Sequence, residues 1–256
     1  MVSDKPKLSI ITVCYKEPAE RIRGTFANIS SQDYDNLEWI VVDGGSPEST
    51  VSAIREFTDR IKCFISEPDS GLYDAMNKGI AHASGDFVIF MNVGDAFIST
   101  GTLSEVAASI SASPSSDCYY GDVVKVSEDG RSRTRVRSVD PVSRYVFHWT
   151  AVCHQATFSR RALYDRIGLF DLRYHLVADQ DWNLRSLSAG AKWMHVPLEI
   201  CEYDASGLTS NPALLRTEYN RLRLAHYNPF EMVVFCVYRK VTGIGRRIRR
   251  WCKAGP

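Results

Sequence analysis

The chain has 256 residues, 45% of them hydrophobic and 24% charged, a composition ordinary for one globular domain. Its seven cysteines are scattered without a Cys-x-x-Cys pair, which disfavours a zinc site or a disulfide framework. The net charge of +1 hides an asymmetry, because residues 239–253 carry seven basic residues and no acidic one. The remaining chain is acidic, with 24 Lys and Arg against 30 Asp and Glu, which disfavours a nucleic-acid-binding protein.

The first part of the chain alternates strand and helix signals. Apolar runs rich in β-branched residues predict strands over Leu8–Tyr15, Leu37–Asp43, Lys62–Ser66 and Phe87–Asn92. Helical spacing of apolar residues predicts helices between them, one of which covers Tyr73–Ala83. Near-continuous apolar strands are typical of a parallel sheet covered on both faces. We therefore expect an α/β fold with a mostly parallel, twisted central sheet flanked by helices.

The pattern changes after a predicted helix at Leu103–Ser111. The later predicted strands are Cys118–Val126, Ser132–Val139, Trp193–Val196 and Leu198–Tyr203, and the later predicted helices are Arg160–Ile167 and Gln180–Ala189. Neither an internal repeat nor a low-complexity linker divides the sequence. We interpret residues 1–229 as a single domain.

Acidic residues follow the predicted strands, at the sheet edge where open α/β folds bind ligands. They are Glu17, Asp43, Glu67, Asp69 and Asp95. Such a cluster is costly unless a cation or a ligand offsets it. The sequence contains neither Gly-x-Gly-x-x-Gly nor a P-loop, so a bound diphosphate would need another counter-charge. A divalent metal ion held by Asp95 meets this need.

Several motifs, in order, resemble a known family. Residues 67–79 read Glu-Pro-Asp-Ser-Gly-Leu-Tyr-Asp-Ala-Met-Asn-Lys-Gly, and Gly85-Asp86 and Asn92-Val93-Gly94-Asp95 follow. The other motifs are Val-Val-Asp-Gly-Gly-Ser at 41–46, Cys153-His154-Gln155, Gly168-Leu169-Phe170-Asp171 and Ala178-Asp179-Gln180-Asp181. Together they are similar to the family 2 glycosyltransferases of bacterial exopolysaccharide pathways, especially the colanic-acid and related capsule or glycolipid branch. The resemblance covers about residues 7–210.

The resemblance implies a GT-A-type fold with a Rossmann-like nucleotide-sugar half at residues 7–112 and an acceptor and catalytic half at residues 113–229. The donor-binding residues that it implies are Val13, Tyr15, Glu17, Asp43, Asn77, Lys78 and Asn92, with Asp43 accepting a hydrogen bond from the base. Asp95 would hold Mn²⁺ or Mg²⁺. Asn92 replaces the usual first Asp of the family's D-x-D motif, so His154 is a candidate second ligand.

The family is inverting, and Asp179 stands in the place of its general base, with Ala178 where a Glu is usual. An inverting transfer is one displacement at the anomeric carbon. It needs a carboxylate that takes the acceptor's proton and a Lewis acid at the leaving diphosphate. Asp181 is a further candidate for acceptor or metal binding, although its i,i+4 spacing to Arg185 favours a structural ion pair. His154 fits a packed, hydrogen-bonded histidine equally well.

The predicted reaction moves a sugar from a nucleotide-diphosphate sugar to a hydroxyl of a glycan or lipid-linked acceptor, in cell-surface polysaccharide or glycolipid synthesis. UDP, GDP and dTDP all stay open as the nucleotide. One alternative is a sugar nucleotidyltransferase, which should carry a glycine-rich loop after the first strand. Another is a degenerate, non-catalytic binding subunit, an interpretation that Asn92 and Ala178 keep open.

Residues 230–256 are predicted to form a basic amphipathic tail. Apolar residues recur at helical spacing from Phe230 to Trp251, and basic residues occupy the remaining positions. This pattern is typical of a helix that lies on an anionic membrane surface, and the alternative is a helix docked on the core. Since we find no signal peptide and no long apolar run, we expect a cytoplasmic protein, peripheral at the inner face of the cell membrane.

Overall fold

The structure is a computed structural model that describes residues 5–127, 131–147, 151–204 and 211–242. Within these ranges nine strands form one sheet in the order β3-β2-β1-β4-β8-β6-β9-β5, with β7 paired to β6. The strands are β1 (Leu8–Cys14), β2 (Leu37–Asp43), β3 (Cys63–Ser66), β4 (Phe87–Phe90), β5 (Ala96–Phe97), β6 (Cys118–Val126), β7 (Arg133–Val136), β8 (Thr157–Arg160) and β9 (Trp193–Asp204).

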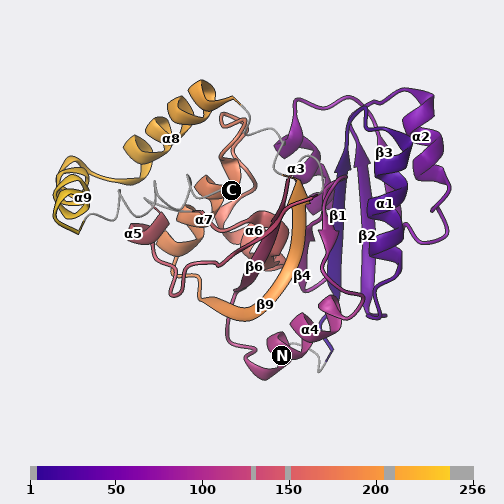
Figure 1. Ribbon diagram of the computed structural model, residues 1–256, viewed down its shortest axis with the longest axis horizontal. Coiled ribbons are helices and arrows are strands. Elements are labelled where there is room, and N and C mark those ends of the chain that lie inside the picture. Colours follow the sequence, from indigo (N-terminus) through magenta and orange to yellow (C-terminus); the bar gives the residue numbers. More distant parts are fainter. Residues whose placement is uncertain (1–4, 128–130, 148–150, 205–210, 243–256) are drawn as a thin grey trace.

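The helices are α1 (Ala19–Ser30), α2 (Glu48–Arg55), α3 (Leu72–His82), α4 (Thr102–Ala112), α5 (Arg144–Phe147), the 3₁₀ turn η1 (His154–Ala156), α6 (Arg161–Ile167), α7 (Ala178–Ser188), α8 (Pro212–His226) and α9 (Pro229–Thr242). Figure 1 shows α1 and α2 on one side of the sheet and α3, α6 and α7 on the other. The predicted α/β architecture, a central sheet flanked by helices, is therefore confirmed.

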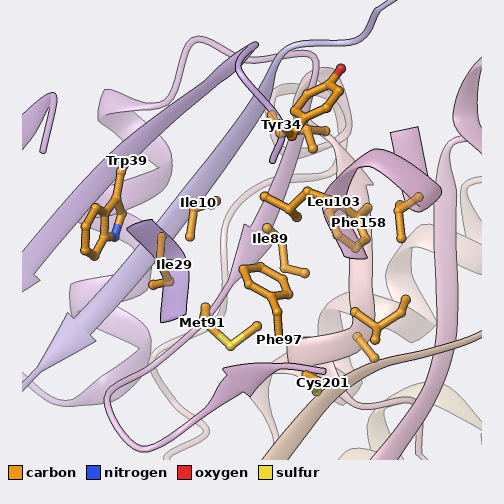
Figure 2. Packing of buried hydrophobic residues seen from close by; sticks show 14 of the residues in the cluster. Ile10, Ile29, Tyr34, Trp39, Ile89, Met91, Phe97, Leu103, Phe158 and Cys201 are labelled. Atoms are coloured by element: carbon orange, nitrogen blue, oxygen red, sulfur yellow. The ribbon is translucent and has the colours of Figure 1, made fainter. Parts of the chain in front are cut away.

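The sheet is mixed: among the described strands four pairings are parallel and four are antiparallel. Strands β1 to β4 run in one direction, and β6 and β9 share it because antiparallel β8 lies between β4 and β6. Side chains alternate between two cores, as expected for strands buried on both faces. On β1, Ile10 faces the core that α1 and α4 cover, whereas Ile11 faces the core of α3 and α7. Figure 2 shows the first core, where Trp39, Ile29 and Met91 pack together with Phe97.

The second half differs from the predictions in several elements, and α5, η1 and α8 were not predicted. The strands expected at Trp193–Val196 and Leu198–Tyr203 are one strand, β9, which pairs with β6 across a register shift between Tyr120 and Asp122. This irregularity accommodates Pro197, which has no N–H for the ladder. Strand β8 was not predicted, because its four residues take their conformation from β4 and β6, which are distant in sequence.

The C-terminal helices α8 and α9 lie at the end of the molecule opposite α1 and α2 (Figure 1). Helix α9 begins at Pro229, close to the expected start of the tail, yet it is not a free appendage. Its Phe235 is buried against Tyr145 and Tyr227, with ring centroids 5.8 and 5.2 Å away. The predicted helical region from Gly243 onward lies outside the described residues. No helix in the described ranges is long and apolar enough to cross a membrane.

Candidate active site

Asp43 ends β2 with its side chain fully buried. Its Oδ2 accepts hydrogen bonds from the Ser46 amide at 3.0 Å and from the Ser66 hydroxyl at 2.7 Å. Its Oδ1 is buried and has no partner. A buried oxygen without a hydrogen bond is costly, so this one is suited to receive an N–H from a ligand.

Residues of three loops pack closely around the end of β2 next to Asp43. A Cβ atom on Gly44 would come within 2.4 Å of the Asp69 carboxylate and 3.1 Å of the Tyr15 ring, so any other residue here would force these side chains to move. Tyr15 is exposed and carries the Lys16 ammonium 4.7 Å from its ring centroid. Glu17 lies beside it and forms an ion pair with Arg21 at 3.5 Å. Val13, in contrast, is buried in the sheet core below these loops.

Asn77 and Lys78 lie on α3, and their polar groups are occupied. The Asn77 amide donates to the Phe170 carbonyl and accepts from the Phe170 N–H, both at 3.0 Å. Lys78 Nζ contacts the Pro68 carbonyl at 2.9 Å and the Glu67 carboxylate at 2.8 Å. In the structure Asn77 therefore holds the Phe170 segment against α3, and Lys78 holds the loop after β3. Their assignment to the donor stays a prediction.

Asn92 and Asp95 lie in the turn between β4 and β5. Burial raises the pKa of the Asp95 carboxyl to about 6, against the opposing effects of His154, a Gln155 hydrogen bond and Arg21. Asn92 Nδ2 approaches His154 Nε2 at 3.3 Å, and its buried Oδ1 has no partner. The turn thus contains both a buried carboxylate and a buried amide oxygen without a partner.

His154 connects this turn to the second half of the chain. Its Nδ1 lies 3.4 Å from Asp179 Oδ2, so a neutral ring with its proton on Nδ1 satisfies both neighbours. Asp179 stands in the first turn of α7, where its Oδ1 accepts from the Tyr73 hydroxyl and the Gln180 amide, both at 2.9 Å. Burial raises the pKa of Tyr73 well above its usual value, which keeps this hydroxyl a donor.

Asp181 points elsewhere. Residues two apart on a helix do not face the same side, so Asp179 and Asp181 diverge. The Asp181 carboxylate is buried, and it contacts Arg185 Nε at 2.7 Å and His226 Nε2 at 2.8 Å. The i,i+4 ion pair expected from the sequence is present, and it leaves Asp181 in a structural cluster that joins α7 to α8.

A divalent cation is the group that the donor chemistry implies at Asp95. Among the residues that the structure describes, no three His, Cys, Asp or Glu side chains cluster as ligands. Asn92 Oδ1 adds an amide oxygen, because it is buried without a partner in the same turn as Asp95. Asp95 and Asn92 Oδ1 fit a hard divalent cation whose remaining ligands would be water or diphosphate oxygens. Both ring nitrogens of His154 are hydrogen-bonded, so His154 would become a ligand only if its Nε2 released Asn92.

The sequence analysis did not identify three residues at the site. Tyr73 binds Asp179, Gln155 binds Asp95, and Glu218 of α8 binds the backbone before α7. Tyr73 and Gln155 stand inside motifs quoted above, so position in a motif was an available signal. Glu218 lies beyond every motif, and no sequence signal marks it.

The mixed sheet, with acidic residues at the ends of its strands, is an α/β fold with a ligand-binding edge. Solved structures agree. S. aureus TarS 1-349 in complex with UDP matches with a TM-score of 0.65 at 20% identity, over 84% of this chain and 64% of that one. The mannosyltransferase PcManGT from Pyrobaculum calidifontis, in complex with GDP-Man and Mn²⁺, matches with a TM-score of 0.60 at 20% identity. This match covers 82% of this chain and 59% of that one. The fold is that of the GT-A glycosyltransferases, and the chain spans less than two thirds of these solved chains.

The family model "Glycosyl transferase family 2" matches residues 9–168. A PGL/p-HBAD biosynthesis glycosyltransferase of Mycobacterium bovis is 33% identical over 218 residues, 83% of this chain and 82% of that protein. An uncharacterized glycosyltransferase of Mycobacterium tuberculosis is 31% identical over 215 residues, 82% and 79% of the two chains. The chain belongs to glycosyl transferase family 2 and is a glycosyltransferase. The predicted family is thereby confirmed, and the colanic-acid branch stays a prediction.

Proposed function

We propose that the enzyme is an inverting glycosyltransferase that moves a sugar from a nucleotide-diphosphate sugar to a hydroxyl of a glycan or lipid-linked acceptor. The observation that carries this proposal is the line Asn92–His154–Asp179, which joins the Asp95 turn of the first half to α7 of the second. Asp95, which would serve the donor side, and Asp179, which would serve the acceptor side, both interact with this histidine.

Asp179 is the general base of this proposal. Its carboxylate receives hydrogen bonds from Tyr73, Gln180 and His154, which fix its orientation. In a single displacement the acceptor oxygen loses its proton to Asp179 as it attacks the anomeric carbon, and the bond to the nucleotide diphosphate breaks. His154 orients Asp179 from the donor side.

Asp95, with Asn92, would hold a divalent metal ion, and His154 would join them if its Nε2 released Asn92. When bound, such an ion stabilises the negative charge of the departing diphosphate. The mannosyltransferase neighbour, whose structure holds Mn²⁺, supports this role. Asp43 and Tyr15 would receive the nucleobase, since Asp43 Oδ1 accepts an N–H and the exposed Tyr15 ring offers a stacking surface.

The acceptor is proposed to be lipid-linked and to belong to cell-surface glycolipid or polysaccharide synthesis. Homologues in glycolipid biosynthesis support this choice. So does helix α9, where Phe230, Val233, Val234 and Val237 are exposed at i, i+3, i+4, i+7 spacing and form one apolar face. The basic sequence that follows complements anionic headgroups, so we place the enzyme at the inner face of the cell membrane.

The reaction is tested with purified protein and a panel of UDP-, GDP- and dTDP-sugars, with and without Mn²⁺, in the wild type and in Asp179→Asn. The substitution is nearly isosteric and removes the proton acceptor, so we expect turnover to fall by about 10²–10⁴-fold. The nucleotide dissociation constant should stay unchanged, because Asp179 faces the acceptor. The anomeric configuration of the product reports inversion.

Retention of configuration contradicts the single displacement. Full activity of Asp179→Asn means that the base lies elsewhere. If no nucleotide sugar of the panel stabilises the wild-type protein, and the wild type turns none of them over, the donor assignment fails.

A further inference from the structure

Glu218 is a buried carboxylate in the middle of α8, and main-chain amides hold it. Its side chain is 3% exposed. Oε1 accepts the His175 N–H at 2.8 Å, and Oε2 accepts the Leu176 N–H at 2.7 Å. Charge-assisted hydrogen bonds of this length are among the stronger ones in proteins, and they offset the cost of burying the charge. Glu218 therefore fixes two consecutive peptide groups.

These peptide groups lie just before Asp179, the proposed base, in the sequence. Leu176 precedes α7, and Asp179 lies in the first turn of that helix. The Leu176 carbonyl lies 3.2 Å from the Tyr73 hydroxyl, which also reaches Asp179 Oδ1 at 2.9 Å. One residue is thus held at its N–H by Glu218 and at its C=O by Tyr73. The same tyrosine hydroxyl touches the carboxylate that would take the proton.

We propose that Glu218 is a positioning residue, which sets the orientation of the Asp179 carboxylate through the backbone of residues 175–176. This inference rests on the proposed function, with Asp179 as the base. A second contact from α8, Arg221 Nη1 to the Arg173 carbonyl at 3.2 Å, holds the same segment. Helix α8 and Asp179 both lie outside residues 9–168, the region that the family model matches.

A purely structural role would look similar, and the chain offers a matched control. Glu38 is also 3% exposed and also binds two consecutive amides, those of Ser84 and Gly85. It lies near the start of β2, at the opposite end of that strand from Asp43. Glu38→Gln therefore reports the loss of a buried carboxylate far from the site.

The experiment compares wild type, Glu218→Gln and Glu38→Gln in the full chain. Amide hydrogen exchange is followed at residues 171–179, and kcat, the acceptor KM and the nucleotide dissociation constant are measured per folded molecule. In Glu218→Gln we expect faster exchange at His175 and Leu176 and a kcat lowered by about 10–100-fold, as for a misplaced catalytic group. The nucleotide dissociation constant should not change. Glu38→Gln should leave all these quantities at wild-type values.

Tyr73→Phe completes the test. Because Tyr73 and Glu218 bind the backbone of the same residue, Leu176, their effects on kcat should be non-additive in a double-mutant cycle. Unchanged exchange at residues 175–176, or an unchanged kcat, overturns the proposal, and so does an equal loss in Glu38→Gln. If the wild type transfers no sugar, the proposed function fails while hydrogen exchange still decides the positioning role. If Glu218→Gln does not fold, Glu218→Asp, too short to reach both amides, is judged by the same criteria.

Discussion

Asp95 is the residue where burial and charge conflict most directly. It is 8% exposed, and burial raises its pKa from 3.8 to about 6. Because the folded-state pKa lies above the unfolded value, folding favours the protonated form. The stability that this provides is full below the unfolded pKa and is lost as the pH rises through about 6. Above that pH the ionised side chain destabilises the metal-free protein.

Asp95→Asn should therefore stabilise the chelator-treated protein at pH 8, by about 1–3 kcal/mol, and change little near pH 4. Mn²⁺ should raise the melting temperature of the wild type and not that of the variant, and transfer should be abolished. Thermal unfolding at both pH values, with chelator and with Mn²⁺, measures these effects. Equal stabilisation of the variant by Mn²⁺ would show that Asp95 is not the ligand.

At the residue scale the sequence identifies which acidic residues end strands, but not which of their oxygen atoms are free. The resemblance to the family implies Asp43 as the residue that accepts a hydrogen bond from the base. That Oδ1 alone is available follows from the Ser66 hydroxyl, which comes from another strand. Likewise, the contact between Tyr73 and Asp179 joins residues 106 positions apart, and no local pattern encodes such a distance.

At the scale of elements, helix α7 is held from two sides with different consequences. Asp179 faces Tyr73 and His154, whereas Asp181 faces Arg185 and His226. Asp181→Asn should lower the free energy of unfolding by about 1–3 kcal/mol, since it breaks a buried ion pair whose arginine is partly solvated. Urea unfolding gives this quantity.

The matched comparison is Asp179→Asn, two residues away on the same helix. Asp181→Asn should keep most of its turnover per folded molecule, and Asp179→Asn should keep its stability. If Asp181→Asn abolishes turnover and Asp179→Asn lowers only stability, then Asp181 is the base and our alignment of residues 178–181 with the family motif is wrong by two residues.

Most elements were predictable because burial on both faces makes the strands of the first half almost wholly apolar. β2 and β6 have the predicted bounds, and β1, β3 and β4 differ from theirs by one or two residues. The elements missed are those whose conformation depends on distant partners. Strand β8 is one, and α8, whose buried positions include the charged Glu218, is another.

At the scale of the whole molecule, the apolar face of α9 and the basic sequence after it concern location and not chemistry. Truncation after Thr242 removes five basic residues and leaves the described fold intact. Each basic residue at an anionic surface contributes about 1 kcal/mol, so binding to phosphatidylglycerol vesicles should fall strongly, and the wild-type binding should weaken with salt. Turnover of a soluble acceptor analogue should persist. Vesicle co-sedimentation and a transfer assay measure both quantities.

Phe230→Ser changes the exposed apolar face without touching buried Phe235, and it should weaken vesicle binding in the full chain. Vesicle binding that neither change reduces would favour a tail docked on the protein.

The strand order also has a consequence for how the chain is made. Strand β4 pairs with β1 on one side and with β8 on the other, and β8 pairs Arg160 with Phe87. On the ribosome, the apolar edge of β4 is therefore complete long before the strand that covers it exists. At about 5–20 residues per second, the delay is roughly 4–15 s. During that interval the nascent first half presents an open, hydrophobic sheet edge, the kind of surface that chaperones shield from aggregation.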